Sequence, residues 1–179
     1  MGAIILCRHG ETAVNAAGAF LSRQDVELSE RGRAQCERLR DALSAHAFAR
    51  VLVSPMRRCL QTREIVAPHL PFDVVDALRE VDFGAWEGKT LEWLERTDPV
   101  ALAQRRGAPV HFRPPQGESF ADVAQRLPAV LQKLEDEGNV LVIGHRGTLG
   151  VLERLLRRLP LESQEVQPLE PAEFRTLSP

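Results

Sequence analysis

Two short apolar runs, each ending abruptly in a histidine motif, constrain the fold of this chain most strongly. The first run, Ala3-Ile4-Ile5-Leu6-Cys7, is followed by Arg8-His9-Gly10-Glu11. The second, at 139–144, is followed by His145-Arg146-Gly147-Thr148. Both runs are short and uncharged, which is typical of buried strands. Because ligands of open α/β sheets gather at the carboxyl ends of strands, the two histidines are candidates for a single site.

Strands and helices alternate along the rest of the chain. Further strands are predicted at 50–53 and at 72–75, the latter at an edge of the sheet. Capping residues predict helix starts at Ser29, Ser54-Pro55, Thr90, Asp98-Pro99 and Ser119, with a kink at Pro128 in the last helix. This alternation favours a three-layer α/β/α sandwich with a mostly parallel central sheet. With no internal repeat or linker, residues 1–179 are expected to form a single domain.

The overall composition argues against several classes of function. A formal net charge of −2 is unlike that of a protein held to nucleic acid by bulk electrostatics. No apolar run approaches the ~20 residues of a membrane span, and no signal peptide is recognisable. The three cysteines (Cys7, Cys36 and Cys59) lie in apolar patterns, so we expect reduced thiols and a cytoplasmic location. We expect neither a nucleic-acid nor a membrane partner, and the oligomeric state, a homodimer included, is left open.

A third strand leads into Ser54-Pro55 and Arg57, the latter in the first turn of a helix. A cation is poorly placed there unless an anion lies in front of it, since a helix N-terminus itself attracts anions. The alternative is that Arg57 is a solvated surface charge. If the three strands are neighbours, two imidazoles and one guanidinium meet at one sheet edge, and Glu80 and Asp82 lie in a loop that can reach it.

This set of residues suits an anion better than a metal ion. Two histidines and a carboxylate are metal ligands in other proteins, but here there is no close histidine spacing and an arginine adjoins each histidine. Guanidinium groups bind phosphate oxygens in a bidentate way. A neutral imidazole is then a nucleophile toward phosphorus, and a carboxylic acid can protonate the leaving oxygen.

At this point the sequence resembles the histidine phosphatase superfamily, which includes the cofactor-dependent phosphoglycerate mutases. The resemblance runs from Ile4 to about Leu156. It is carried by an ordered series of motifs: Arg8-His9-Gly10-Glu11-Thr12 with Asn15, Asp25, 28–32, Ser54-Pro55-Met56-Arg57, Gln61-Thr62, Leu78-Arg79-Glu80, 83–88, Gly117-Glu118-Ser119 and 142–147. A phosphoglycerate mutase-like fold is therefore expected.

The resemblance implies roles for individual residues. His9 would become phosphohistidine, while Arg8, Arg57 and His145 would hold the phosphoryl oxygens. Glu80 would be the acid to the leaving group and then the base for water, with Asp82 as the alternative acid. No metal and no cofactor are implied.

Three further positions are candidates for binding the substrate. Asn15 is either a secondary phosphate or loop contact or a plain turn residue. Ser22 stands in the Leu21-Ser22 pair, where relatives often carry Gln-Gly or Thr-Gly. Arg146 replaces a common glycine and adds a cation next to His145.

Two departures from the mutases favour hydrolysis. The Arg-His-Tyr that mutases carry after the acid is missing after Glu80, and the connection from Trp86 to Gly117 is short. The 83–88 and Gly117-Glu118-Ser119 pieces resemble alpha-ribazole phosphatases and their broad-specificity relatives. We therefore expect a metal-independent phosphomonoesterase that hydrolyses a small phosphorylated metabolite, alpha-ribazole phosphate being one candidate. A phosphoglycerate mutase and a catalytically silent phospholigand-binding module remain the alternatives.

Overall fold

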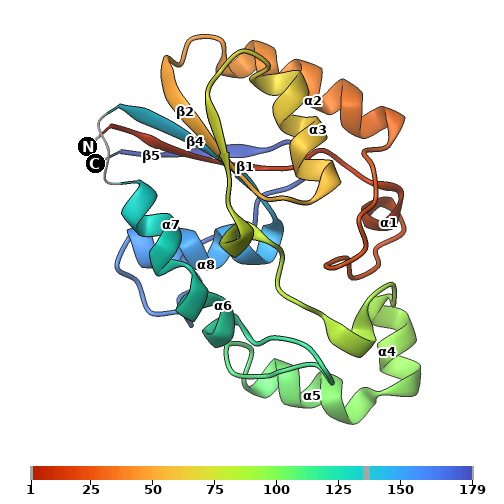
Figure 1. The fold of residues 1–179 in the computed structure, drawn as a ribbon. Helices are drawn as coiled ribbons and strands as arrows, with labels where there is room; N and C mark the ends of the chain where they lie inside the picture. Colours follow the sequence, from red (N-terminus) through yellow and green to blue (C-terminus); the bar gives the residue numbers. More distant parts are fainter. Residues whose placement is uncertain (1, 135–137, 179) are drawn as a thin grey trace.

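One twisted sheet runs through the middle of the computed structural model, which describes residues 2–134 and 138–178 (Figure 1). Within those residues five strands form the sheet in the order β3-β2-β4-β1-β5. The strands are β1 (Ile4–Arg8), β2 (Phe48–Val53), β3 (Phe72–Val74), β4 (Asn139–Gly144) and β5 (Phe174–Leu177). Strand β4 pairs in parallel with both β1 and β2, β3 is parallel to β2, and only β5 runs antiparallel. The mostly parallel sheet that the sequence predicts is confirmed.

The register brings three strand ends together. Arg8 of β1 pairs with Gly144 of β4, and Val53 of β2 pairs with Ile143 of the same strand. The ladder continues one residue further, because His9 N donates to Gly144 O at 3.1 Å and Ser54 N donates to Ile143 O at 3.0 Å. The residues that follow the three central strands therefore share one edge of the sheet.

Helices cover both faces of the sheet, as predicted. Helices α2 (Glu30–Leu43) and α3 (Arg57–Val66) lie on one face, and α6 (Phe120–Arg126), α7 (Pro128–Lys133) and α8 (Arg146–Leu156) lie on the other (Figure 1). Successive strand residues point to opposite faces. Accordingly Ile5 and Cys7 pack in a core with α2 and α3, whereas Ile4 and Leu6 pack in a second core with α6 to α8. The result is a three-layer α/β/α sandwich.

Three helices, α1, α4 and α5, lie beside the sheet rather than on it. Helix α1 (Ala13–Ala16) follows the first histidine motif, and α4 (Leu91–Thr97) and α5 (Pro99–Gly107) form a separate corner of the molecule (Figure 1). The N-caps expected at Ser29, Thr90 and Asp98 are present, and each accepts a backbone N–H. Short 3-10 turns stand at Asp76–Leu78 and Gly84–Trp86. No helix in the described part of the chain is long and apolar enough to cross a membrane.

Two local predictions need correction. Ser54 does not cap α3, which begins at Arg57; its hydroxyl instead lies 2.8 Å from His145 Nε2, and Asp25 Oδ1 accepts from Arg57 N at 2.7 Å. Pro128 does more than kink a helix. It ends one helix and begins the next, since it has no N–H to donate and suits the first position of α7.

Candidate active site

The two histidines that the sequence singles out lie face to edge at the carboxyl ends of β1 and β4. Their ring centroids are 5.2 Å apart and the ring planes meet at 63°. Both rings are buried, His9 being 3% exposed and His145 fully covered. Because β1 and β4 are adjacent and in register, the pairing of His9 with His145 follows directly from the topology.

The backbone fixes which nitrogen of His9 is free. His9 Nδ1 lies 2.7 Å from the carbonyl oxygen of Gly10, and a carbonyl can only accept, so Nδ1 carries the proton. The lone pair of the neutral ring is then on Nε2. Gly10 itself must lack a side chain, because a Cβ there would lie 2.6 Å from the carbonyl oxygen of Gly32 in α2.

Burial and positive neighbours keep both rings neutral. Desolvation lowers the pKa of His9 well below its usual value, and the charges of Arg58 and Arg8 lower it further. The pKa of His145 is lowered in the same way by desolvation and by Arg58. His9 is therefore neutral at physiological pH, with a lone pair on Nε2, which is the state a nucleophilic imidazole requires.

Two buried arginines flank the histidines. Arg8 Nη1 donates to Leu169 O at 2.9 Å and stands 3.8 Å from the exposed carboxylate of Glu170. Arg58 is fully buried, and its guanidinium donates to Gln24 O at 2.9 Å and Ser22 O at 3.0 Å. Among residues 2–134 and 138–178 Arg58 forms no ion pair with any carboxylate. A buried cation is stable only when its charge is balanced, so this one calls for an anion.

Arg57, the arginine selected from the sequence, is not brought to the histidines. Its side chain is 58% exposed and pairs with Glu27 Oε1 at 2.6 Å on the surface. The next residue, Arg58, points inward instead and was missed. A signal was present: Arg58, Thr62 and Val66 are spaced by four residues and share the buried side of α3, on which Arg57 does not lie.

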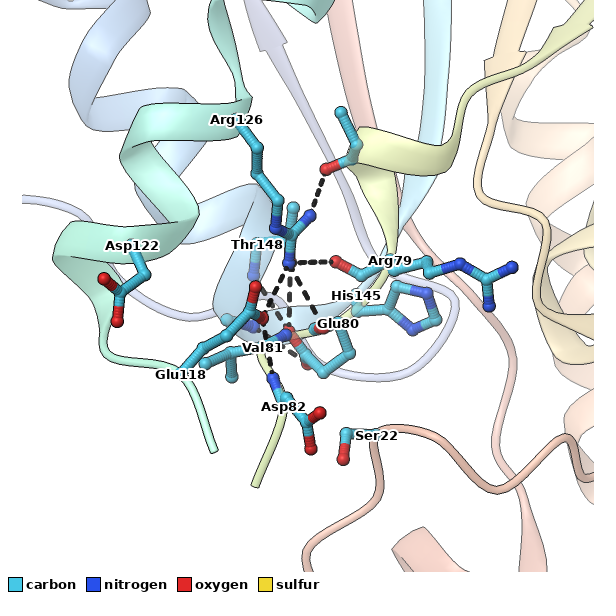
Figure 2. Close-up of polar contacts among 12 residues, drawn as sticks. Ser22, Arg79, Glu80, Val81, Asp82, Glu118, Asp122, Arg126, His145 and Thr148 are labelled. Carbon is cyan, nitrogen blue, oxygen red and sulfur yellow. Dashed lines mark hydrogen bonds and ion pairs between the residues drawn. The ribbon is translucent and has the colours of Figure 1, made fainter. Parts of the chain in front are cut away.

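Glu80 lies beside the same pair of strands, held by the start of α8. Its Oε2 accepts from Gly147 N at 3.1 Å and its Oε1 accepts from Thr148 N at 3.0 Å (Figure 2). A Cβ at position 147 would lie 2.7 Å from Glu80 Oε1, so glycine is needed for this approach. Asp82, the alternative acid, instead accepts from Arg23 Nε at 2.9 Å and does not line the cavity.

The remaining candidates are placed around a cavity of about 840 Å³. Asn15 and Arg146 line it together with Arg8 and Glu80, and Arg146 stands 3.9 Å from Glu170. Ser22 does not line it. The Ser22 hydroxyl bonds to the carboxylate of Glu87 while its carbonyl holds Arg58, so Ser22 lies behind the arginine. Arg8 and Glu80 line the cavity, whereas His9, Arg58 and His145 are buried and are not among its lining residues. We call these five residues the floor.

One buried thiol lies near the floor histidines. Cys59 Sγ lies 3.5 Å from His145 Nε2, but burial raises the pKa of this thiol to about 12, so it stays protonated. Within the residues that the structure describes, no group of three or more His, Cys, Asp or Glu side chains is arranged to hold a metal ion.

Comparison with known proteins identifies the family. The sequence model of the histidine phosphatase superfamily (branch 1) matches residues 4–178. The 6-phosphofructo-2-kinase/fructose-2,6-bisphosphatase 1 of Bos taurus is 36% identical over 151 residues, which are 83% of this chain. The match covers 31% of that protein, so the chain spans about a third of the length of the curated relatives it matches.

Solved structures agree in fold over almost the whole chain. A putative alpha-ribazole-5'-P phosphatase from Escherichia coli superposes with a TM-score of 0.87 at 28% identity, over 98% of this chain and 89% of that one. A mycobacterial glucosyl-3-phosphoglycerate phosphatase in complex with VO3 superposes with a TM-score of 0.90 at 27% identity, over 99% and 93% of the two chains. The chain is a member of branch 1 of the histidine phosphatase superfamily.

Proposed function

We propose that this protein is a metal-independent phosphomonoesterase that works through a phosphohistidine at His9. The observation that carries the proposal is the fully buried Arg58, a cation with no ion-pair partner in the described part of the chain, beside two neutral imidazoles. A phosphoryl group supplies the missing negative charge and is the group with which a neutral imidazole reacts.

In the first step the Nε2 lone pair of His9 attacks phosphorus as the bond to the leaving oxygen breaks. Arg8, Arg58 and His145 hold the remaining phosphoryl oxygens and stabilise their charge. Glu80 donates its proton to the departing oxygen, so the product leaves as an alcohol. The imidazole is left with phosphorus on Nε2 and its original proton on Nδ1, still bonded to Gly10 O.

In the second step water attacks the phosphorylated ring. Glu80, now a carboxylate, accepts the proton of the attacking water, and the P–N bond breaks to release inorganic phosphate. His9 returns to the neutral state in which it began. The lowered pKa of His9 favours this return, because burial and the two guanidinium groups disfavour an imidazolium product.

A small phosphorylated metabolite is the substrate class we propose. The cavity of about 840 Å³ falls within the range of small-molecule sites. Its wall includes the aromatic rings of Phe20, Phe83 and Phe120. Alpha-ribazole phosphate is the leading candidate, since its aromatic base suits such a wall and a structural neighbour is named for it. Fructose 2,6-bisphosphate and glucosyl-3-phosphoglycerate are the other compounds to test.

Phosphate release from p-nitrophenyl phosphate in the presence of a chelator tests the proposal. We expect wild-type activity to persist with the chelator, and the His9→Ala variant to lose at least about 10³-fold in kcat. The wild-type chain should also carry an acid-labile, alkali-stable phosphoryl group after rapid quenching, and the variant should not. A thermal unfolding curve for each chain shows whether His9→Ala still folds.

The same assays separate the alternatives. Full activity in His9→Ala would contradict the proposal. Interconversion of 2- and 3-phosphoglycerate faster than their hydrolysis would indicate a mutase instead. A wild-type chain that forms no phosphoenzyme with any phosphodonor would indicate a module that binds phospholigands without turnover.

A further inference from the structure

One arginine outside the cavity holds the backbone at and before the candidate acid. Arg126 is the last residue of α6, and its guanidinium reaches across to residues 77–80 (Figure 2). It donates to the carbonyl oxygen of Ala77, to Arg79 O at 2.9 Å and to Glu80 O at 3.2 Å. Three carbonyls of one short segment, that of Glu80 included, therefore accept from a single side chain.

A second residue completes this brace. Glu118 Oε2 accepts from Arg126 Nη2 at 3.3 Å and from Asp82 N at 2.9 Å. Glu118 N also donates to Asp82 O at 2.8 Å. The chain is thus held two residues after Glu80 as well as at and before it. Both side chains are about three-quarters covered, at 23% and 24% exposure.

The carboxylate of Glu80 is fixed from the opposite side. It accepts from Gly147 N and Thr148 N of α8, and the Thr148 hydroxyl donates to Arg79 O at 2.6 Å. Arg79 O is therefore shared by α6 and α8. The backbone of the acid depends on Arg126, while its carboxyl group depends on the first turn of α8.

We propose that Arg126, seated on Glu118, is the positioning residue for the proton transfer by Glu80. The proposal rests on the proposed phosphatase function. Arg126 is not among the residues that line the cavity, and Glu80 is the floor residue to which its guanidinium donates, so we expect it to act on the reaction through Glu80. Displacing a catalytic group by about 1 Å can cost as much as ~10²-fold in rate. Removing the hydrogen bonds of Arg126 should allow Glu80 a displacement of about that size.

Dependence on the leaving group distinguishes this role from a merely structural one. The value of kcat/KM covers the steps up to release of the alcohol. A nitrophenolate leaves without a proton, whereas an alkoxide needs one from Glu80. We expect Arg126→Met to lower kcat/KM for glycerol 2-phosphate by about 10- to 100-fold and that for p-nitrophenyl phosphate by less than about 3-fold. Glu80→Gln should shift the ratio in the same direction and further.

Three more variants make the experiment decisive. Arg126→Lys should restore part of the ratio, and Glu118→Ala should shift it as Arg126→Met does, which covers the case where Arg126→Met fails to fold. Arg113→Met is the matched control, because Arg113 pairs with Asp122 of the same helix at 2.6 Å but is 61% exposed. Its ratio should equal that of the wild type.

The possible failures are distinguishable. A wild-type chain that hydrolyses neither ester overturns the proposed function and this role with it. A wild-type chain that is active, with a shifted ratio in Glu80→Gln but unchanged ratios in Arg126→Met and Glu118→Ala, overturns the positioning role alone. Equal losses on both esters in the Arg126 variants also overturn it, since they indicate only a loss of folded protein.

Discussion

The floor and the outer wall of the cavity are built on opposite principles. Every floor residue is at most 6% exposed, and most hydrogen bonds of the floor side chains go to main-chain groups. The outer wall, by which we mean α4, α5 and the loop to 118, carries its cations differently. Arg105 of the wall lies over the rings of Phe20 and Trp86 at 5.1 and 5.7 Å. No hydrogen bond or ion pair holds it to another residue in the described ranges.

This difference assigns the reaction to the floor and the selection of the substrate to the outer wall. A main-chain partner keeps its place whatever side chains surround it, so the floor is preorganised to hold a phosphoryl group and stabilise its charge. The wall guanidinium rests on ring faces, which attract a cation without fixing its direction. We infer that the floor sets the reaction and that the wall adjusts which phosphate ester is accepted.

The largest expected effect tests the floor at two adjacent arginines. Arg58→Met should lower kcat/KM for p-nitrophenyl phosphate by about 10²- to 10³-fold, because it removes a charged donor aimed at developing negative charge. Arg57→Met makes the same exchange one residue earlier and should stay within about 3-fold, since losing an exposed ion pair changes little. Steady-state kinetics on both variants, with thermal unfolding as a check on folding, measure the contrast.

A loss at Arg57 as large as that at Arg58 would contradict the distinction between the buried floor and the exposed surface. It would mean that the surface ion pair of Arg57 with Glu27 takes part in the reaction, although 58% of the Arg57 side chain is exposed. The floor would then extend to the surface of α3.

These two arginines also show where sequence reasoning ends. The strands at 3–7 and 139–144 and the histidines after them were predictable, because buried strands have an unmistakable pattern and parallel strands end at one edge. Adjacent residues of a helix point about 100° apart. Predicting which of Arg57 and Arg58 points inward therefore requires knowing where α3 begins. Ser54-Pro55 indicated a helix start at these two residues, whereas α3 begins at Arg57.

Ser22 illustrates a second limit. Its position after the first histidine motif suggested a contact with substrate, yet it lies behind Arg58. Its amide and hydroxyl donate to the carboxylate of Glu87, 65 residues later. No local sequence pattern predicts a hydrogen bond between two loops so far apart in the chain. The same holds for the brace from Arg126 to residues 77–82, which depends on how α6 packs.

The stability of the folded protein should depend on pH through the two buried histidines of the floor. The pKa values of His9 and His145 are lowered in the folded protein. Below about pH 6.5 these two rings therefore bind protons in the unfolded chain but stay neutral in the folded one. Their contribution to stability is full above that pH and is lost as the pH falls. Each ring should cost up to about 1.4 kcal/mol per pH unit below pH 6.5, until its folded pKa is reached.

Urea unfolding at pH 7.5 and pH 5.5 measures this loss. His145→Asn should lose less free energy of unfolding between the two pH values than the wild type does, because one lowered pKa is gone. The same exchange at the exposed His69 is the control for the substitution itself. An unchanged pH dependence in His145→Asn would show that the buried ring is not the acid-sensitive element.

The smallest expected effect lies in the wall. Arg105→Met should raise KM by about 3- to 10-fold for esters with a second anionic group, such as fructose 2,6-bisphosphate, since one partly exposed charge contributes about 1 kcal/mol. For p-nitrophenyl phosphate KM should change by less than about 2-fold, because that ester has no second anion for Arg105 to meet. Initial rates over a range of each substrate give both constants.

Arg106→Met is the matched control for this wall prediction. Arg106 is the next residue of α5, but it is 64% exposed and pairs with Glu95 Oε1 at 2.9 Å, so its charge is already balanced. If both variants raise KM equally, the effect is a general change in surface potential. Added salt would then weaken it, because the Debye length is only about 10 Å at 0.1 M ionic strength. If only Arg105→Met raises it, the Arg105 guanidinium over Phe20 and Trp86 selects the substrate. The outer wall would then recognise a second anionic group of the substrate, whereas the floor holds its phosphoryl group.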